Sequence, residues 1–254
     1  MSAEVARPHS REFVQALAAE LSKLWSLPAV WLTLGGSLIL NLVLAAAFVS
    51  AGLQDLTGTP NALDIGLASI SYIQAGYIVL GIVASCSEYT GGQIRTTLTA
   101  MPRRSLQLIA AHLALMIVVV PAALITATSG VLLAAIALGD ASAPVELGST
   151  VGILAGVTGY LGLTTLISAS FGVLLRRTLP AAIVVLGYYF IAGPLLREQT
   201  AHAKYLPDTA GLAMWFPQPG DASALSPVHG ATVLVAWTLG AFVVALAVYR
   251  KRDT

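Results

Sequence analysis

The sequence contains few charged residues and a single cysteine. Asp, Glu, Lys and Arg make up 10% of the 254 residues, while 57% are hydrophobic, and the mean hydropathy is +0.82. Soluble domains usually devote about a quarter of their residues to charge, so the composition excludes a soluble globular domain and predicts an integral membrane protein. The lone Cys86 excludes an internal disulfide.

The sequence also lacks the usual motifs of nucleotide and metal chemistry. It has no G-x-x-x-x-G-K-[ST] phosphate loop, so we expect no ATP site of that kind in this chain. Its four histidines are scattered, without a His-Glu-x-x-His or paired-cysteine spacing, so we expect no metal site and no cofactor. Residues 127–130, Ala-Thr-Ser-Gly, come near the G-x-S-G of rhomboid proteases, with His229 as the candidate base, but the first glycine is missing. We therefore expect no enzyme activity from the chain by itself.

Six apolar blocks are long enough to cross a membrane as helices, which requires about 20 residues each. The stretch 105–139 is too long for one ordinary crossing and too short for two. We expect one span there, with 131–138 either extending the helix or lying at the outer interface. The predicted fold is a single all-α transmembrane domain over 1–254, with spans at about 29–50, 65–87, 105–127, 149–175, 178–196 and 229–249.

Positive charge is distributed unevenly about these spans. All but two of the 13 Lys and Arg residues fall on one side of the six-span arrangement, and the exceptions are Arg197 and Lys204. Lys and Arg favour the cytoplasmic side of membrane proteins. Both termini are therefore predicted to be cytoplasmic.

Two further segments are not predicted to span the membrane. An apolar stripe in 10–27 favours an amphipathic helix in the inner interface, and a helix packed against a partner is the alternative. The stripe consists of Phe13, Leu17, Leu21 and Leu24. The external segment 197–228 contains four prolines and yet includes the apolar run 210–216. We expect this segment to re-enter the outer leaflet before the last span.

Polar residues inside spans are the usual functional candidates in a membrane protein. Here they are Asn41, Gln74 and His112, each of which could equally form a structural hydrogen bond between helices. None carries a fixed charge, which argues against a proton- or sodium-coupled carrier. The fourth span also has a predicted small-residue face for close helix packing, formed by Gly148, Gly152, Gly156 and Gly159.

The loop between the second and third spans, 88–104, is unusually polar for this chain. With one flanking residue on each side it reads SEYTGGQIRTTLTAMPRRS. Glu88 would cost about 3 kcal/mol at the bilayer centre, so it belongs at the cytoplasmic end of the second span. After a glycine pair that can end this helix, Ile94 and Leu98 lie four residues apart on one face of a predicted short helix. We expect a folded element with an apolar ridge and a basic rim, and an ordinary loop packed on its own protein is the alternative.

This loop resembles that of the membrane permease subunits of type-2 ATP-binding-cassette (ABC) exporters, which include bacterial antibiotic- and lantibiotic-export permeases. The similarity extends over most of the chain: an interfacial start, six spans with both ends inside, and a long outer segment before the last span. The resemblance implies that the loop is a coupling helix that docks on an ATPase subunit. The residues that carry it are Glu88, Gly91, Gly92, Ile94, Arg95, Leu98 and Arg103.

The resemblance also implies partners and a mechanism. Two permease chains, identical or paralogous, would assemble with two nucleotide-binding ATPase subunits, which bind ATP and Mg, in a bacterial plasma membrane. The exported cargo would be hydrophobic or amphipathic, such as a drug, a peptide or a lipid-like molecule, and no nucleic acid is expected. In this family the first, second and fifth spans line the path. The lining candidates are Asn41, Gln74 and Tyr188, and the candidates for an external gate are Trp215 and Phe216.

Two other classes of protein remain as alternatives: a stand-alone secondary transporter and an intramembrane enzyme. The transporter would need a charged residue near the middle of a span, and the enzyme would need a convergent acid, base or metal set. The sequence displays neither. A neighbouring gene that encodes a phosphate-loop ATPase would favour the permease over both.

The charge distribution generates a test of the orientation. In a Cys86→Ser background, we expect Ser142→Cys and Ser223→Cys to react with a membrane-impermeant thiol reagent added outside intact cells. Thr99→Cys should not react, because residue 99 lies on the basic side. Labelling is read as a mass shift of the purified protein, and the reverse pattern would contradict the predicted orientation.

Overall fold

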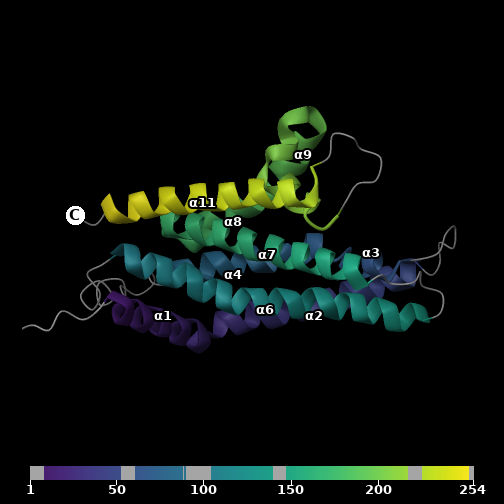
Figure 1. Ribbon diagram of the computed structural model, residues 1–254, viewed down its shortest axis with the longest axis horizontal. Helices are drawn as coiled ribbons and strands as arrows, with labels where there is room; N and C mark the ends of the chain where they lie inside the picture. The colour runs from purple at the N-terminus through teal and green to yellow at the C-terminus, as the bar shows by residue number, and fades with distance from the viewer. Residues whose placement is uncertain are drawn as a thin grey trace, which may run out of the picture.

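The computed structural model describes residues 9–52, 61–87, 89, 104–139, 147–216 and 225–251, and the regular elements in these residues are all helical (Figure 1). Six of the helical stretches are long and apolar enough to cross a membrane. The predicted all-α fold with six spans is thereby confirmed. The spans are Pro28–Ala51, Ala62–Cys86, Ser105–Leu138, Gly148–Leu175, Thr178–Gln199 and Pro227–Lys251.

Most of the spans are single helices, and two of them are composite. The second span consists of α3 and α4, and the fifth continues from α8 through the π-helix η3 into α9. Asn61 begins the second span because its side-chain oxygen accepts a hydrogen bond from the Leu63 N–H at 3.0 Å, as expected of a helix cap. The elements are α1 (His9–Ser26), α2 (Pro28–Gly52), α3 (Ala62–Leu67), α4 (Ile70–Cys86), α6 (Arg104–Leu138), α7 (Leu147–Leu175), α8 (Thr178–Gly187), η3 (Tyr188–Ala192), α9 (Gly193–Gln199), η4 (Ala201–Tyr205), α10 (Pro207–Ala213) and α11 (Pro227–Lys251).

The third span is the longest helix of the bundle. The 35 residues of α6 are continuous, so 131–138 extend the helix. At about 1.5 Å per residue such a helix is about 50 Å long, which exceeds the roughly 30 Å of a hydrocarbon core. The helix must therefore tilt or project beyond the hydrocarbon layer.

The helices α4 and α7 occupy the middle of the bundle, with α2 and α6 on one side and α8 and α11 on the other (Figure 1). In their most apolar windows, 61% of the second span and 50% of the fourth are buried, against 22% or less of the first, fifth and sixth. Most of the surface of the first, fifth and sixth spans is therefore not covered by the rest of the described chain. The second and fourth form the core on which the others pack.

Two glycines allow α4 and α7 to approach closely. A Cβ atom added to Gly81 would lie 2.3 Å from the carbonyl oxygen of Thr165, and one added to Gly172 would lie 3.0 Å from the Cβ of Ser85. A side chain at Gly81 would therefore collide with the backbone of the facing helix. Small residues at such crossings are typical of membrane bundles, where close backbone approach maximises van der Waals contact.

Within the described chain, the predicted small-residue face of the fourth span makes close contact at two of its four glycines. An added Cβ atom would meet nothing within 4 Å at Gly148 or Gly152. At Gly156 it would lie 2.3 Å from the Met214 carbonyl oxygen, and at Gly159 it would lie 3.0 Å from the Met214 Cε. The close contact is thus made with the segment between the fifth and sixth spans and not with another spanning helix.

The N-terminal helix α1 packs along α6. Ala16, Glu20 and Leu24, which are spaced four residues apart, are buried on this side. Where α1 meets the first span, the rings of Trp25 and Trp31 pack edge to face with centroids 4.9 Å apart. The structure therefore provides a helix with a bundle-facing side, and the location of that helix in the membrane interface remains a prediction.

The segment after the fifth span, 200–216, folds back onto the bundle. Its helix α10 packs against α11, where an added Cβ at Gly230 would lie 2.5 Å from the Ala210 carbonyl oxygen. This contact, together with that of Gly156 and Met214, holds the middle and the C-terminal end of α10 against spanning helices. Re-entry of this segment into the outer leaflet stays a prediction.

Candidate functional site

The predicted path residue Asn41 lies at the contact of the first three spans. Its Nδ2 donates hydrogen bonds to the Thr126 carbonyl at 2.9 Å and to the Ser129 Oγ at 3.2 Å, and its Oδ1 accepts one from the Ser69 hydroxyl at 2.7 Å. The side chain is fully buried. In this conformation Asn41 ties α2 to α4 and α6, and contact with cargo would require these bonds to open.

The predicted path residue Gln74 reaches the fourth span. Its Oε1 accepts a hydrogen bond from the hydroxyl of Tyr160, which is 1% exposed. The Tyr160 ring lies against Gly211 of α10, where an added Cβ would collide with the ring carbons at 2.4 Å. It also faces the ring of Trp215, with centroids 6.4 Å apart. Tyr160 therefore joins the second span, the fourth span and the 200–216 segment.

The predicted path residue Tyr188 belongs to a second polar group, which we call the Asp208 cluster: Tyr188, Arg197, Asp208 and Thr209. The Tyr188 hydroxyl donates to the Asp208 Oδ1 at 2.9 Å, and the Arg197 Nη2 donates to the Oδ2 at 3.0 Å. The Arg197 Nε donates to the Thr209 Oγ1 at 3.2 Å. The Asp208 side chain is 4% exposed and that of Arg197 is 35% exposed. A carboxylate that is almost fully buried is thus held by one tyrosine and one arginine.

Local backbone structure brings the members of the Asp208 cluster together. Tyr188 begins the π-helical turns of η3, and such turns are frequent at functional positions of helices. Gly193 follows directly, and a Cβ there would lie 2.5 Å from the Asp208 Oδ2, so only glycine admits the carboxylate. Pro207 occupies the first turn of α10, and Asp208 follows it in the same turn, where the helix dipole favours a negative charge.

The two predicted gate residues differ in their surroundings. Trp215 is 4% exposed and packs against Tyr160. Phe216 is half exposed, and its ring centroid lies 5.8 Å from that of Trp215. The Trp215 indole N–H has no hydrogen-bond acceptor among the described residues. A buried donor of this kind costs about 1–3 kcal/mol until it finds a partner, so Trp215 offers a polar contact to a ligand or a water.

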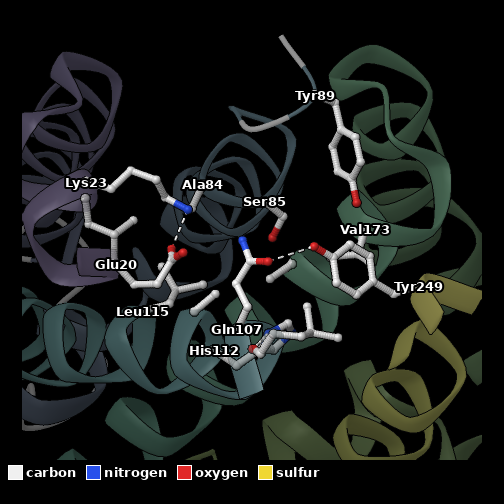
Figure 2. Close-up of a pocket in the computed structure, with 14 residues that line it drawn as sticks. Glu20, Lys23, Ala84, Ser85, Tyr89, Gln107, His112, Leu115, Val173 and Tyr249 are labelled. Carbon is white, nitrogen blue, oxygen red and sulfur yellow. Dashed lines mark hydrogen bonds and ion pairs between the residues drawn. The ribbon is translucent and has the colours of Figure 1, made fainter. Parts of the chain in front are cut away.

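A small polar pocket lies at the opposite end of the bundle, where α1, α4, α6, α7 and α11 meet (Figure 2). Gln107 lies within it and accepts a hydrogen bond from the Tyr249 hydroxyl at 3.1 Å. The ion pair of Glu20 and Lys23 faces the pocket from α1, and Tyr89 reaches it from above in the view. The volume is about 30 Å³, which suits one or two waters and no larger cargo.

This pocket is where the predicted coupling loop begins and ends. The loop leaves α4 after Cys86 and returns at Arg104, the first residue of α6, and Tyr89 is its single described residue between 88 and 103. The Arg176 guanidinium lies over the Tyr89 ring, 5.4 Å from its centroid. The predicted coupling residues lie outside the described part of the chain: Glu88, Gly91, Gly92, Ile94, Arg95, Leu98 and Arg103.

The polar span residue His112 and the residues of the protease-like motif, Ser129 and His229, each have a hydrogen-bonding neighbour within the described chain. His112 Nε2 lies 3.3 Å from the Ser170 Oγ, and Ser129 belongs to the hydrogen-bonded group around the first-span asparagine. His229 Nδ1 lies 2.7 Å from the Ser226 Oγ, three residues earlier. In the described ranges, no three His, Cys, Asp or Glu side chains group in a way that could hold a metal ion.

Sequence reasoning missed the Asp208 cluster. Asp208 lies in a segment that was expected to be external, and its partners Tyr188 and Arg197 precede it by 20 and 11 residues. The available signal was Arg197, a basic residue on the side of the spans that carries almost none. An arginine in that position implies an acidic partner nearby, because an unpaired charge next to hydrocarbon is costly.

Comparison with models of known protein families and with curated proteins finds no match for the chain. The six apolar helices define the class: a multi-pass membrane protein. Its function has to be argued from the bundle and from the loop motif.

The Asp208 cluster predicts a stability difference between two matched variants. Removing one partner from a buried ion pair costs about 3–5 kcal/mol, and the partial exposure of Arg197 reduces this through solvent screening. We expect Asp208→Asn to lower the free energy of unfolding by about 1–3 kcal/mol. The same change at exposed Asp64 of α3 should stay within about 0.5 kcal/mol of wild type.

Both variants are measured by denaturant titration of the purified protein in detergent micelles. Hydrogen exchange of the 207–216 amides should also accelerate in Asp208→Asn and not in Asp64→Asn, because the cluster holds α10 against the fifth span. Equal stability of the two variants would show that the ion pair does not anchor this segment.

Proposed function

We propose that the chain is the membrane permease subunit of an ATP-driven type-2 ABC exporter of a bacterial plasma membrane. One observation carries the proposal: the loop with the Glu-Tyr-x-Gly-Gly-x-Ile-Arg-Thr-x-Leu pattern joins α4 to α6 at the end of the bundle where the basic residues gather. We call this the basic end. Its described basic residues are Arg11, Lys23, Arg104, Arg176, Arg177, Arg250 and Lys251.

The basic end has the features expected of a surface that faces a cytoplasmic ATPase. The positive-inside rule assigns it to the cytoplasm. The amphipathic helix α1 packs there against α6, and the small polar pocket connects α1, α6 and α11 next to the loop. A force applied to the loop would therefore act directly on α4 and α6, and through the pocket on α1 and α11.

A continuous series of contacts leads from the loop to the far end of the bundle. The loop follows α4, and Gln74 of α4 accepts a hydrogen bond from Tyr160 of α7. Tyr160 in turn packs on Gly211 and Trp215. The same segment is tied to the fifth span through Asp208. We propose that ATP-driven movement of α4 is passed along these contacts to the 200–216 segment, which opens and closes the outer exit.

The proposal assigns the remaining roles as follows. The chain has no phosphate loop, so ATP and Mg bind to separate ATPase subunits. A second permease chain, identical or paralogous, completes the path. The apolar spans suit a hydrophobic or amphipathic cargo, such as a drug, a peptide or a lipid-like molecule.

A stand-alone secondary transporter is a second candidate, and one observation favours it. The sequence displays no charge in the middle of a span, but the bundle buries the Asp208 carboxylate beside Arg197 and Tyr188. Buried carboxylates of this kind carry protons or sodium ions in many carriers. Transport in sealed vesicles that is driven by an ion gradient without any ATPase, and is lost in Asp208→Asn, would favour this candidate.

The proposal predicts the behaviour of two matched loop variants. Ile94→Asp with Leu98→Asp would place two charges in an apolar contact with the ATPase, which costs several kcal/mol. We expect the amount of ATPase that co-purifies with the chain to fall at least about tenfold. The control, Ile94→Leu with Leu98→Ile, preserves the apolar ridge and should co-purify like wild type.

The measurement uses co-expression with the ATPase encoded next to this gene, followed by affinity purification through the permease. Membrane insertion of each variant is checked by the accessibility of an engineered cysteine on the far side. A milder variant, Glu88→Ala, should leave the complex assembled and lower the transport per ATP hydrolysed. Normal co-purification and normal transport in the double aspartate variant would show that 88–104 is an ordinary loop and not a coupling element.

A further inference from the structure

A large groove lies between the fourth, fifth and sixth spans. Both α8 and α11 pack on α7, and they make little contact with each other. Its volume is about 870 Å³, within the range of ligand sites. Phe171 of α7, Val184 of α8 and Val244 of α11 are among the residues that line it.

The walls of the groove determine what can fill it. They are almost entirely apolar and belong mostly to spans, so at this depth the surrounding solvent is lipid and not water. Tyr205, Leu206 and Pro207, which follow the fifth span, form part of the wall on the side away from the basic end. The Trp237 indole N–H holds this wall by donating to the Tyr205 carbonyl at 2.9 Å. A single acyl chain fits such a space, whereas a spanning helix of a partner would need room to continue past Tyr205.

A positive charge lies beside the Tyr205 wall of the groove. The Lys204 ammonium is 5.4 Å from the centroid of the Tyr205 ring. Unlike Arg197, which pairs with Asp208, Lys204 forms no ion pair with an acidic side chain in the described part of the chain. It is also one of the two basic residues on the side of the spans that is otherwise free of them. Among the described residues, the Lys204 ammonium thus lies next to an apolar groove without an acidic partner.

We propose that this groove binds one resident membrane phospholipid, with an acyl chain along α7, α8 and α11 and its phosphate at the Lys204 ammonium. The apolar walls and the adjacent cation complement the two parts of such a molecule. The inference depends on the membrane location of the helices and not on the transport proposal. If it fails, the permease assignment is unaffected, and the reverse also holds.

Two glycines that have free space beside them provide a matched pair of variants, which tests whether the groove binds an acyl chain. An added Cβ would meet nothing within 4 Å at Gly240 of α11 or at Gly35 of α2. Gly240 lines the groove and Gly35 does not. Gly240→Phe therefore fills the groove without a backbone collision, while Gly35→Phe adds the same ring elsewhere in a span.

The full chain is reconstituted in nanodiscs that contain phosphatidylglycerol with a photoreactive diazirine on one acyl chain, and the labelled peptides are mapped by mass spectrometry. We expect the labelled residues to be concentrated in 167–174, 184–189 and 233–244, and one tightly held lipid per chain to remain after detergent exchange. In Gly240→Phe, most of the labelling and most of the retained lipid should be lost. Gly35→Phe should match wild type. Labelling of the groove no stronger than that of exposed Leu32 and Ile39 of α2 would reveal annular lipid only and overturn the proposal.

The phosphate contact is tested by a second variant that does not alter the groove. Lys204→Gln should lower labelling by the phosphatidylglycerol probe about threefold, as expected for a partly exposed ion pair. It should not change labelling by a diacylglycerol probe with the same acyl chain, because that probe has no phosphate. Equal loss with both probes, no loss with either, or a groove that stays unlabelled because a second copy of the chain covers it would contradict the proposal.

Discussion

The close approach of α4 and α7 is the constraint on which the rest of the bundle depends. Gly81 lets the backbones of the second and fourth spans meet at Thr165, and the other spans pack around this pair. In a membrane the lipid tails are as apolar as leucine, so helix association depends on van der Waals fit and interhelical hydrogen bonds. Because α4 and α7 meet closely, Gln74 and Tyr160 come within hydrogen-bonding distance, and Tyr160 can reach α10. A larger residue at Gly81 would separate the helices and break this connection.

The buried polar contacts lie where separate helices of the bundle meet. Asn41 joins the first three spans, Gln74 and Tyr160 join the centre, and Asp208 joins the 200–216 segment to the fifth span. Each such contact between spans contributes about 0.6–2 kcal/mol, enough to select one arrangement but weak enough to exchange during a transport cycle. The proposed exporter needs contacts of this strength, because movement at the basic end has to change the packing at the opposite end.

The six spans could be predicted because each leaves a local signal, a run of apolar residues of membrane length. The contacts between spans left no comparable signal. Gly148 and Gly152 repeat at the same spacing as Gly156, yet only Gly156 meets a close neighbour, because the contact depends on where α10 folds back. Asp208 falls in the segment predicted to be external, and its partners are on other elements. The apolar groove is formed by three spans and a connecting segment, so no single stretch of sequence encodes it. The loop that carries the resemblance, 88–104, falls almost entirely outside the described residues, and its role rests on the pattern of its sequence.

The central claim is that this chain conducts cargo and a separate subunit supplies the energy. The most direct measurement isolates the chain from its native membranes, identifies the proteins that accompany it, and assays ATP hydrolysis by the intact complex and by the chain stripped of its partners. The account predicts a phosphate-loop ATPase in equal number to the permease chains, hydrolysis by the complex and none by the chain alone. Hydrolysis by the isolated chain, or a native complex without a phosphate-loop ATPase, would contradict it.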